Sequence, residues 1–422
     1  MVKEILPKLS SSRIQRHLLK LQQFGNKWPG TDGEVQTKEY IHKQMKKYGI
    51  ETRLEEFEYP KWHPISYSAK IKSPEEQEIK CAPVAYYANK EAEGELVYVG
   101  SGSKPEFETL KNAGIDFNEK IVMATSDYPF AITSLVEECG AVGLITVSTA
   151  IEDLIRWCVG AFYSTTATPT LYENPMDFPA KITGAMIPMS EGRRLLSLMS
   201  VGKVRVHVAS NAEYSLGKSC NIISEVKGTE RPEEKVIIGA HYDTQFTTPG
   251  ICDNGSGTAG LLEIARAVKK SNICPKRTMV FVWFGCEEIG CWGSVDYTKK
   301  HEKNLRKSCV GYINIDGPCN QPAMKHTLWV SDSMRSFAAE TAKIIGWKLH
   351  SIEGASETIG DYGPFRDIGI PTAMFVEYPP PHPYYHTEKD SIEFAPHPKD
   401  LARTLEVSAL CAIRLASTDK RF

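Results

Sequence analysis

Histidine and acidic residues follow a series of apolar segments in the second half of this 422-residue sequence. Taken singly, each is an ordinary feature of a loop or turn. Together they offer two imidazoles and three carboxylates as candidate metal ligands: His241, Asp253, Glu288, Asp316 and His386. Crowded carboxylates repel one another and are costly to remove from water, so divalent cations are their natural counter-charge.

The number and type of these ligands indicate which metals they would bind. Nitrogen and oxygen ligands without cysteine suit zinc, with Mn²⁺ or Co²⁺ as alternatives. Five ligands are too many for one tetrahedral ion that keeps an open position. They are the right number for two ions that share a carboxylate, as in hydrolases whose two metals lie about 3.5–4 Å apart. The sequence therefore predicts two Zn²⁺ per chain.

The segments that precede these residues have the pattern of an α/β protein. The continuous apolar run Val236–Ala240 is typical of a strand buried on both faces. Further strands are expected at Thr278–Trp283, Val310–Ile315 and Pro371–Val376, with amphipathic helices between them. Alternating strands and helices favour a mainly parallel mixed sheet flanked by helices, whose ligands lie beyond the carboxyl ends of the strands. All the candidate ligands follow a predicted strand.

The middle of the chain has a different pattern of predicted elements. Short β-rich runs, such as Glu95–Val99, surround a predicted helix near 131–139. We interpret residues 81–210 as an inserted, β-rich α+β domain. Residues 1–80 and 211–422 would then form the first and second parts of the α/β domain.

The ordered motifs resemble those of the co-catalytic zinc aminopeptidases, a family related to bacterial leucyl aminopeptidases, glutamate carboxypeptidase II and the transferrin receptor. The residues that carry the resemblance are Gly239–Asp243, Asp253–Gly257, Glu287–Ser294, Asn314–Asp316 and Tyr385–Thr387. The resemblance implies the phosphorylase/hydrolase-like fold of zinc exopeptidases. The inserted segment is similar to a protease-associated domain through Gly94–Val99, Lys120–Val122 and Gly140–Gly143.

The resemblance also implies how the ligands are shared between the two metals. Asp253 would bridge them. His241 and Asp316 would complete the site of one ion, and Glu288 and His386 would complete the site of the other. Each ion would thus have one imidazole, one carboxylate of its own and one oxygen of the shared carboxylate.

Two further acidic residues receive catalytic roles by the same resemblance. Glu287 is the remaining carboxylate and is expected to act as general base, taking a proton as a metal-bridging hydroxide attacks the scissile carbonyl. Asp243 is expected to orient the imidazole of His241. A cis peptide bond is expected between Asp253 and Asn254.

The expected reaction is release of an N-terminal amino acid from a peptide substrate. A carboxypeptidase or an N-acyl amino-acid hydrolase on the same metal site is a second interpretation, because Arg366 could hold a substrate carboxylate. A non-catalytic binding protein is a third, since some relatives such as the transferrin receptor have lost their metals.

Composition argues against several other classes. Lys and Arg total 50 against 52 Asp and Glu, a formal charge of −2, whereas nucleic-acid-binding proteins normally have a basic excess. No apolar run approaches the ~18–20 residues of a membrane span. The sequence begins without a secretory pattern, and its 11 cysteines include no C-x-x-C pair. We therefore expect a cytoplasmic protein that binds neither nucleic acid nor membranes; self-association into a homo-oligomer is left open.

Overall fold

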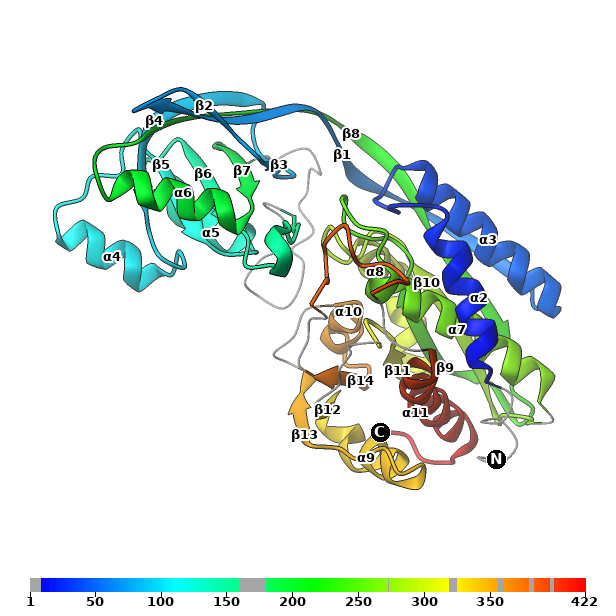
Figure 1. The fold of residues 1–422 in the computed structure, drawn as a ribbon. Helices are drawn as coiled ribbons and strands as arrows, with labels where there is room; N and C mark the ends of the chain where they lie inside the picture. Colours follow the sequence, from blue (N-terminus) through cyan, green and yellow to red (C-terminus); the bar gives the residue numbers. More distant parts are fainter. Residues whose placement is uncertain are drawn as a thin grey trace.

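The computed structural model describes residues 9–159, 180–271, 273–318, 325–355, 360–378, 383–394 and 398–422. Two lobes are joined by two long paired strands, β1 (Thr52–Ser73) and β8 (Arg205–Val226) (Figure 1). We call the lobe that contains both chain ends the inner lobe. The other, built from described residues between 74 and 204, is the outer lobe.

The inner lobe is built on a mixed sheet. Its strand order is β13-β12-β14-β11-β9-β10-β8, with β1 beside β8. Strands β9, β10, β11 and β14 run parallel, whereas β8 and β12 run antiparallel to their neighbours β10 and β14. The remaining strands are β9 (Arg231–His241), β10 (Arg277–Phe284), β11 (Cys309–Asn314), β12 (Lys325–Val330), β13 (Ser351–Gly354) and β14 (Thr372–Tyr378). The predicted α/β sheet flanked by helices is confirmed.

Helices cover both faces of this sheet because its central strands are apolar on both sides. Ile238 and Phe281 belong to the core under one helix layer, and Ile237 and Val280 to the core under the other. The first layer is α2 (Ser11–Gln22), α3 (Asp32–Tyr48), α7 (Ser256–Lys270), α9 (Arg335–Ile344) and α11 (Pro398–Ser417). The second is α8 (Trp292–Ser308) and α10 (Tyr362–Asp367).

Local signals in the sequence explain where individual helices begin and end. The side chain of Thr31 accepts a hydrogen bond from the Glu34 amide at the start of α3, and Gly49, with φ of 75°, ends that helix. A capping box of Ser103 and Glu106 begins α4. A short helical turn, η3 (Ile251–Gly255), leads into α7.

The outer lobe continues the sheet in the order β8-β4-β5-β6-β7-β3. Its elements are β2 (Gln77–Ile79), β3 (Ala82–Pro83), β4 (Lys90–Tyr98), α4 (Lys104–Asn112), β5 (Ile121–Thr125), α5 (Phe130–Glu138), β6 (Gly143–Val147), η2 (Ile151–Asp153), β7 (Thr183–Ile187) and α6 (Met189–Met199). β8 passes through residue 210 without a break, and the proposed division at 80/81 and 210/211 stays a prediction. The likeness of this lobe to a protease-associated domain also stays a prediction.

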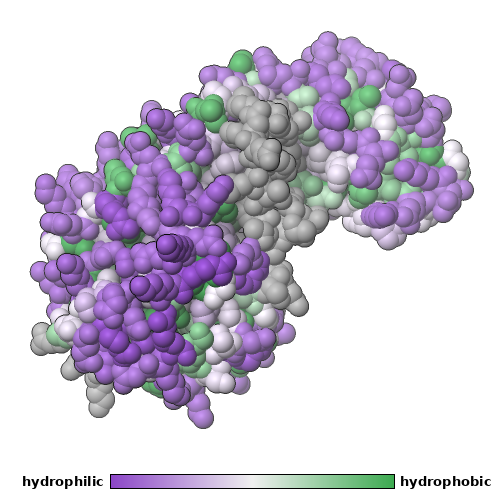
Figure 2. Space-filling view, turned by 180° about the vertical axis from the view of Figure 1, so that it is seen from behind, coloured by the Kyte–Doolittle hydropathy of each residue, from purple (hydrophilic) through white to green (hydrophobic). Residues whose placement is uncertain are grey.

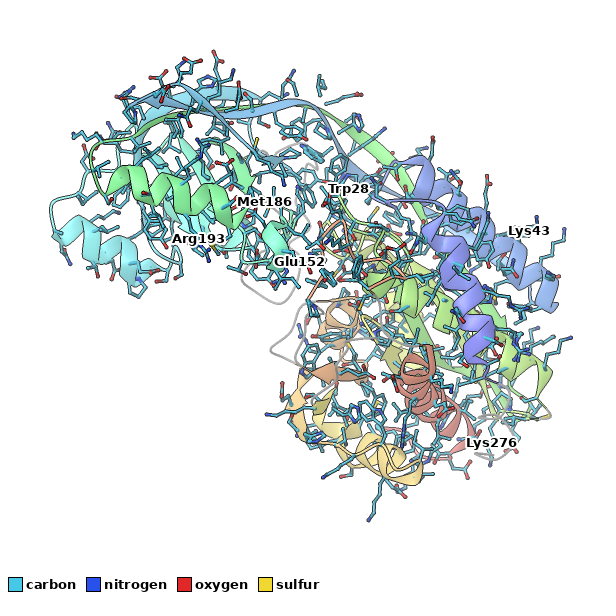
Figure 3. All side chains as sticks on the ribbon, in the orientation of Figure 1. Trp28, Lys43, Glu152, Met186, Arg193 and Lys276 are labelled. Atoms are coloured by element: carbon cyan, nitrogen blue, oxygen red, sulfur yellow. The ribbon has the colours of Figure 1, made fainter. Side chains whose placement is uncertain are left out.

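Aromatic side chains fill the junction between the lobes. Trp28 packs edge-on against Trp62 and Trp157, with ring centroids 5.9 and 5.1 Å apart. All three indoles are buried, and Phe246 joins them from the loop after β9. Figure 3 labels Trp28 between the two lobes. Buried aromatic contacts of this kind stabilise an interface beyond the area they cover. The two lobes therefore share a hydrophobic core.

One face of the molecule is largely polar. The face in Figure 2 carries hydrophilic residues over most of both lobes, with hydrophobic residues scattered in small areas. Among the residues that the structure describes, no helix is both long and apolar enough for a membrane span. No disulfide joins cysteines within these residues either.

Candidate metal centre

The five candidate ligands meet at the carboxyl edge of the parallel strands. His241 is the last residue of β9, and Asp316 lies two residues beyond the end of β11. Glu288 follows β10, and Asp253 lies in η3 before α7. His386 lies on the segment 383–394, after β14. Side chains up to 145 positions apart in the sequence thus come together because parallel strands end at one edge.

The ligands form two groups that share Asp253. One is His241, Asp253 and Asp316, and the other is Asp253, Glu288 and His386; the ligand atoms within each group lie within 4.8 Å of one another. The Nε2 atom of His241 is 3.1 Å from Asp253 Oδ1 and 3.2 Å from Asp316 Oδ1. The Nε2 atom of His386 is 3.2 Å from Asp253 Oδ2 and 3.5 Å from Glu288 Oε2. The two oxygens of Asp253 therefore face one imidazole each.

Burial and mutual repulsion or attraction shift the pKa values of the side chains in both groups. Burial, reinforced by the charge of Asp253, raises the pKa of Glu288 well above its usual value, and burial also raises the pKa of Asp316. Burial alone would lower the pKa of His241, but the carboxylates of Asp316 and Glu287 outweigh it and raise that pKa. Burial opposes ionisation of Asp253 too, yet hydrogen bonds from both imidazoles hold its pKa below the usual value.

A metal ion fits this donor set. Within the described ranges, no lysine or arginine forms an ion pair with Asp253, Glu287, Glu288 or Asp316. Buried carboxylates need a cation or a proton to offset the loss of solvation. Oxygen and imidazole nitrogen ligands without thiolate are those of zinc in hydrolytic sites. The two groups could therefore hold metal.

Asp243 connects the segment after β10 with the end of β9. Its carboxylate accepts hydrogen bonds from the backbone N–H groups of Glu287 and Glu288, both at 3.1 Å. The Nδ1 atom of His241 lies 3.2 Å from the backbone oxygen of Asp243 and 3.6 Å from its carboxylate. One fully buried carboxylate thus fixes the strand end after β10 and lies beside the imidazole at the end of β9.

Glu287 and Glu288 point in different directions. Gln245 directs Glu288, because its side-chain amide donates to Glu288 Oε2 at 2.7 Å and its backbone N–H donates to Oε1 at 3.1 Å. Glu287 instead reaches toward His241, with Oε2 3.9 Å from Nε2. Burial raises the pKa of Glu287 well above its usual value. Glu287 is thus a carboxyl group at the edge of both candidate metal groups.

The backbone around Asp253 is held by side chains from other loops. The Asp253–Asn254 peptide bond is cis, which confirms that expectation. The Asn254 side chain donates to the Ile315 carbonyl at 2.9 Å and accepts from the Gly257 amide at 2.9 Å. Asp390 accepts hydrogen bonds from the backbone N–H groups of Cys252 and Asp253, at 2.7 and 3.1 Å. The shared ligand is therefore connected to the loops that carry Asp316 and His386.

A cavity of about 170 Å³ opens onto both ligand groups. Asp253, Glu287, Glu288, Asp316 and His386 line one side of it. Gln245 and Tyr385 also line it, and the outer lobe contributes Tyr128, Phe130, Cys158 and Val159. The cavity therefore has an acidic floor from the inner lobe and a largely apolar wall from the outer lobe.

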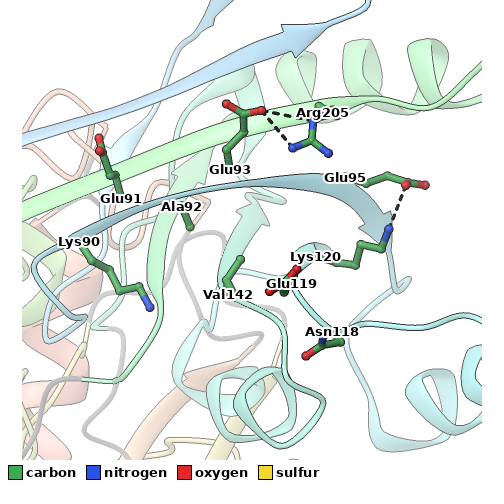
Figure 4. Close-up of a pocket in the computed structure, with 10 residues that line it drawn as sticks. All are labelled: Lys90, Glu91, Ala92, Glu93, Glu95, Asn118, Glu119, Lys120, Val142 and Arg205. Carbon is green, nitrogen blue, oxygen red and sulfur yellow. Dashed lines mark hydrogen bonds and ion pairs between the residues drawn. The ribbon is translucent and has the colours of Figure 1, made fainter.

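A second hollow, of about 440 Å³, lies in the outer lobe between β4, β8 and residues 118–120, just before β5. Four of its charged side chains form pairs: Arg205 lies 3.1 Å from Glu93, and Lys120 lies 2.9 Å from Glu95 (Figure 4). No candidate metal ligand lines it.

Several site residues could not be found by following strand ends. Gln245 and Asp390 each lie four residues beyond a predicted ligand, so proximity in sequence was the one available signal. Tyr128, Phe130 and Cys158 belong to the outer lobe, and no sequence pattern connects them to the metal ligands. Arg366 donates to the Ala355 carbonyl at 2.8 Å and pairs with Asp367. It is not among the described residues that line the cavity.

Comparisons with known proteins identify similar peptidases. The probable glutamate carboxypeptidase AMP1 of Arabidopsis thaliana is 24% identical over 94% of this chain and 65% of its own length. Aminopeptidase YwaD of Bacillus subtilis is 33% identical over 40% of this chain and 39% of its own length. The matches thus span less than two thirds of each of these relatives.

Solved structures share the fold along the whole chain. A peptidase M28 precursor from Shewanella amazonensis has a TM-score of 0.76 at 20% identity, covering 100% of this chain and 97% of its own. An aminopeptidase from Aneurinibacillus sp. strain AM-1 has a TM-score of 0.74 at 23% identity, covering 100% and 98%. The model of peptidase family M28 matches residues 221–411. The resemblance drawn from the sequence motifs is therefore confirmed: residues 221–411, which carry all five candidate ligands, match the model of peptidase family M28.

Proposed function

We propose that this protein is an aminopeptidase that holds two zinc ions, one in each ligand group, and releases N-terminal amino acids from peptides. The two-ion arrangement is supported by the position of Asp253, whose two carboxylate oxygens face His241 and His386 separately. The relatives named aminopeptidase support the reaction class.

The acidic lining of the cavity favours a substrate with a free N-terminus. Glu287, Glu288, Asp253 and Asp316 line it, and the described residues around it include no lysine or arginine. An acidic surface attracts the ammonium group of a free peptide N-terminus, whereas a terminal carboxylate needs a cationic partner. Arg366, the candidate for that partner, is instead committed to Ala355 and Asp367.

The catalytic step follows from the placement of Glu287. When bound, the ions would polarise the scissile carbonyl and acidify a water molecule. Glu287 takes the proton of the attacking water and delivers it to the departing amine. A raised pKa suits the first step, because it strengthens binding of the proton that Glu287 takes from the water. Glu288, held by Gln245, stays oriented toward Asp253 and His386.

The outer lobe limits which part of a peptide reaches this site. Tyr128, Phe130 and Val159 close one side of the cavity opposite the carboxylates. The small volume of the cavity, about 170 Å³, favours removal of terminal residues over cleavage within a chain.

A substrate panel on metal-analysed protein tests the proposal. We expect cleavage of dipeptides and amino-acyl p-nitroanilides with a free N-terminus, and no cleavage of their N-acetylated counterparts. Amidation of the C-terminus should leave the rate nearly unchanged, because no carboxylate is recognised. Removal of metal with a chelator should abolish turnover, and zinc should restore it.

Two results would contradict the proposal. Cleavage of N-acetylated peptides only when their C-terminus is free would indicate a carboxypeptidase. Absence of hydrolysis by protein that carries two zinc ions would indicate a binding protein or a hydrolase of another amide. The Glu287→Gln variant, tested in parallel, controls for a contaminating peptidase.

A further inference from the structure

Three consecutive residues of the outer lobe contact the candidate ligand His386 and the residues just before it. The backbone N–H of Trp157 donates to the His386 carbonyl at 2.9 Å. The Cys158 sulfur lies 3.2 Å from His386 Nδ1. Arg156 donates to the Tyr385 carbonyl at 3.2 Å and to the Pro383 carbonyl at 3.4 Å. The side-chain contacts among these join residues 227 to 229 positions apart.

The segment that makes these contacts is itself anchored firmly. Arg156 lies 3.2 Å from Asp127, a buried residue just beyond β5, and its backbone N–H donates to Ser148, just beyond β6. The Trp157 indole is fully buried in the aromatic junction and donates to the Pro83 carbonyl at 2.7 Å. A rigid support of this kind can hold a ligand in a fixed position.

The conformation of His386 requires such support. Its φ is 57°, a left-handed value that histidine rarely adopts. Residues in this region persist where surrounding structure holds them, and they cluster at functional sites. The hydrogen bond from Trp157 restrains the backbone of His386. Arg156 restrains the carbonyl groups of Pro383 and Tyr385, which precede it.

The ring orientation of His386 depends on the same segment. Its Nε2 atom faces Asp253 and Glu288, and its Nδ1 atom faces the Cys158 sulfur. With a metal ion bound to Nε2, the ring proton would lie on Nδ1, beside that sulfur. Metal-binding histidines almost always donate their second ring N–H to a neighbour, which fixes the tautomer and the ring plane. His241 has an oxygen of Asp243 for this purpose, whereas His386 has a sulfur from the other lobe.

We propose that Arg156, Trp157 and Cys158 of the outer lobe position His386 as a metal ligand, so that this lobe is a structural part of the Asp253–Glu288–His386 site. The inference rests on the metal-binding part of the proposed function. It assigns no catalytic step to these residues: they act through His386.

Zinc affinity, measured by competition with a chromophoric chelator on the full chain, tests this inference. The His386→Ala variant first identifies which of the two binding steps belongs to this site. In Cys158→Ala we expect zinc affinity at that step to fall about 10-fold or more, the lower end of the effect of outer-shell changes, while the other step stays within about twofold. Arg156→Gln should weaken the same step.

Two comparisons separate positioning from general stability. Cys158→Ser keeps a hydrogen-bond acceptor beside Nδ1 and should recover most of the lost affinity. Cys411→Ala removes a buried sulfur from α11, away from the site, and should leave both steps unchanged.

Equal affinities in wild type and in both Cys158→Ala and Arg156→Gln would overturn the inference. So would equal weakening of both binding steps with a matching fall in the melting temperature of the metal-free protein. Because the readout is zinc binding, these outcomes are independent of whether the zinc-loaded protein cleaves peptides.

Discussion

Substitution of Asp243 by asparagine is the sharpest perturbation of the metal centre. Its carboxylate accepts one backbone N–H with each oxygen, from Glu287 and from Glu288. Asparagine has the same shape but only one acceptor oxygen, since its other terminal atom is an NH₂ donor. In Asp243→Asn, one of the two N–H groups must therefore face another donor.

The expected size of the effect follows from the lost hydrogen bond. A hydrogen bond to a charged group contributes about 1.5–3 kcal/mol, and the remaining bond is also weakened because the acceptor is neutral. Part of this loss lowers the free energy of unfolding, and part lowers metal affinity, because Glu288 shifts relative to Asp253. We expect a 10–100-fold loss of zinc affinity, or about 1.4–2.7 kcal/mol.

Zinc competition and urea denaturation of the metal-free protein measure the two parts. Asp116→Asn provides a matched control, because Asp116 likewise accepts a backbone N–H, from Asn118 at 2.9 Å, but lies before β5 in the outer lobe and does not line the cavity. The control should leave zinc affinity unchanged.

Unchanged zinc affinity in Asp243→Asn would refute this reasoning. It would mean that the hydrogen bonds of Asp243 are not needed to position Glu287 and Glu288.

Three other predictions follow from the structure. Glu287→Gln should lower kcat by about 10²–10⁴-fold while zinc content stays at the wild-type value; steady-state kinetics with metal analysis measure both, and wild-type turnover would exclude Glu287 as general base. Burial raises the pKa of Glu34 from 4.5 to about 7, so the folded protein binds this proton more tightly than the unfolded chain. The free energy of unfolding should therefore fall as pH rises from about 4.5 to about 7, by up to about 3 kcal/mol relative to Glu34→Gln in urea denaturation; parallel pH profiles would contradict this. Gly293→Ala should destabilise the fold and lower zinc content, because a Cβ atom there would lie 2.4 Å from the Gly285 carbonyl oxygen, two residues before Glu287; a thermal melt and metal analysis check it, and a fully metallated, equally stable variant would disprove it.

The strands that carry the metal ligands were predictable from sequence because they are buried on both faces. Val236–Ala240 reads as one apolar run and lies within β9, and Val310–Ile315 overlaps β11. Once these strands are placed, the parallel topology brings the residues after them to one edge. The two imidazoles and three carboxylates therefore lie close together, although their roles stay predictions.

Contacts between the lobes were not predictable, because they depend on tertiary packing between distant segments. Cys158 and His386 are 228 residues apart and lie on irregular segments without periodic pattern. The length of β1 was also missed. Charged residues such as Arg53, Glu55 and Glu58 alternate with its apolar residues, so the strand shows no continuous apolar run.

The paired strands β1 and β8 have a consequence for how the polypeptide tolerates cleavage. They are aligned from the Thr52–Ser224 pair at the inner lobe to the Ser73–Arg205 pair at the far end of the outer lobe. A single proteolytic nick between Ser73 and Arg205 would leave two fragments that remain joined by this backbone ladder. Dissociation of the fragments would require the whole ladder to open, so nicked protein should migrate as one particle under native conditions and as two bands after denaturation.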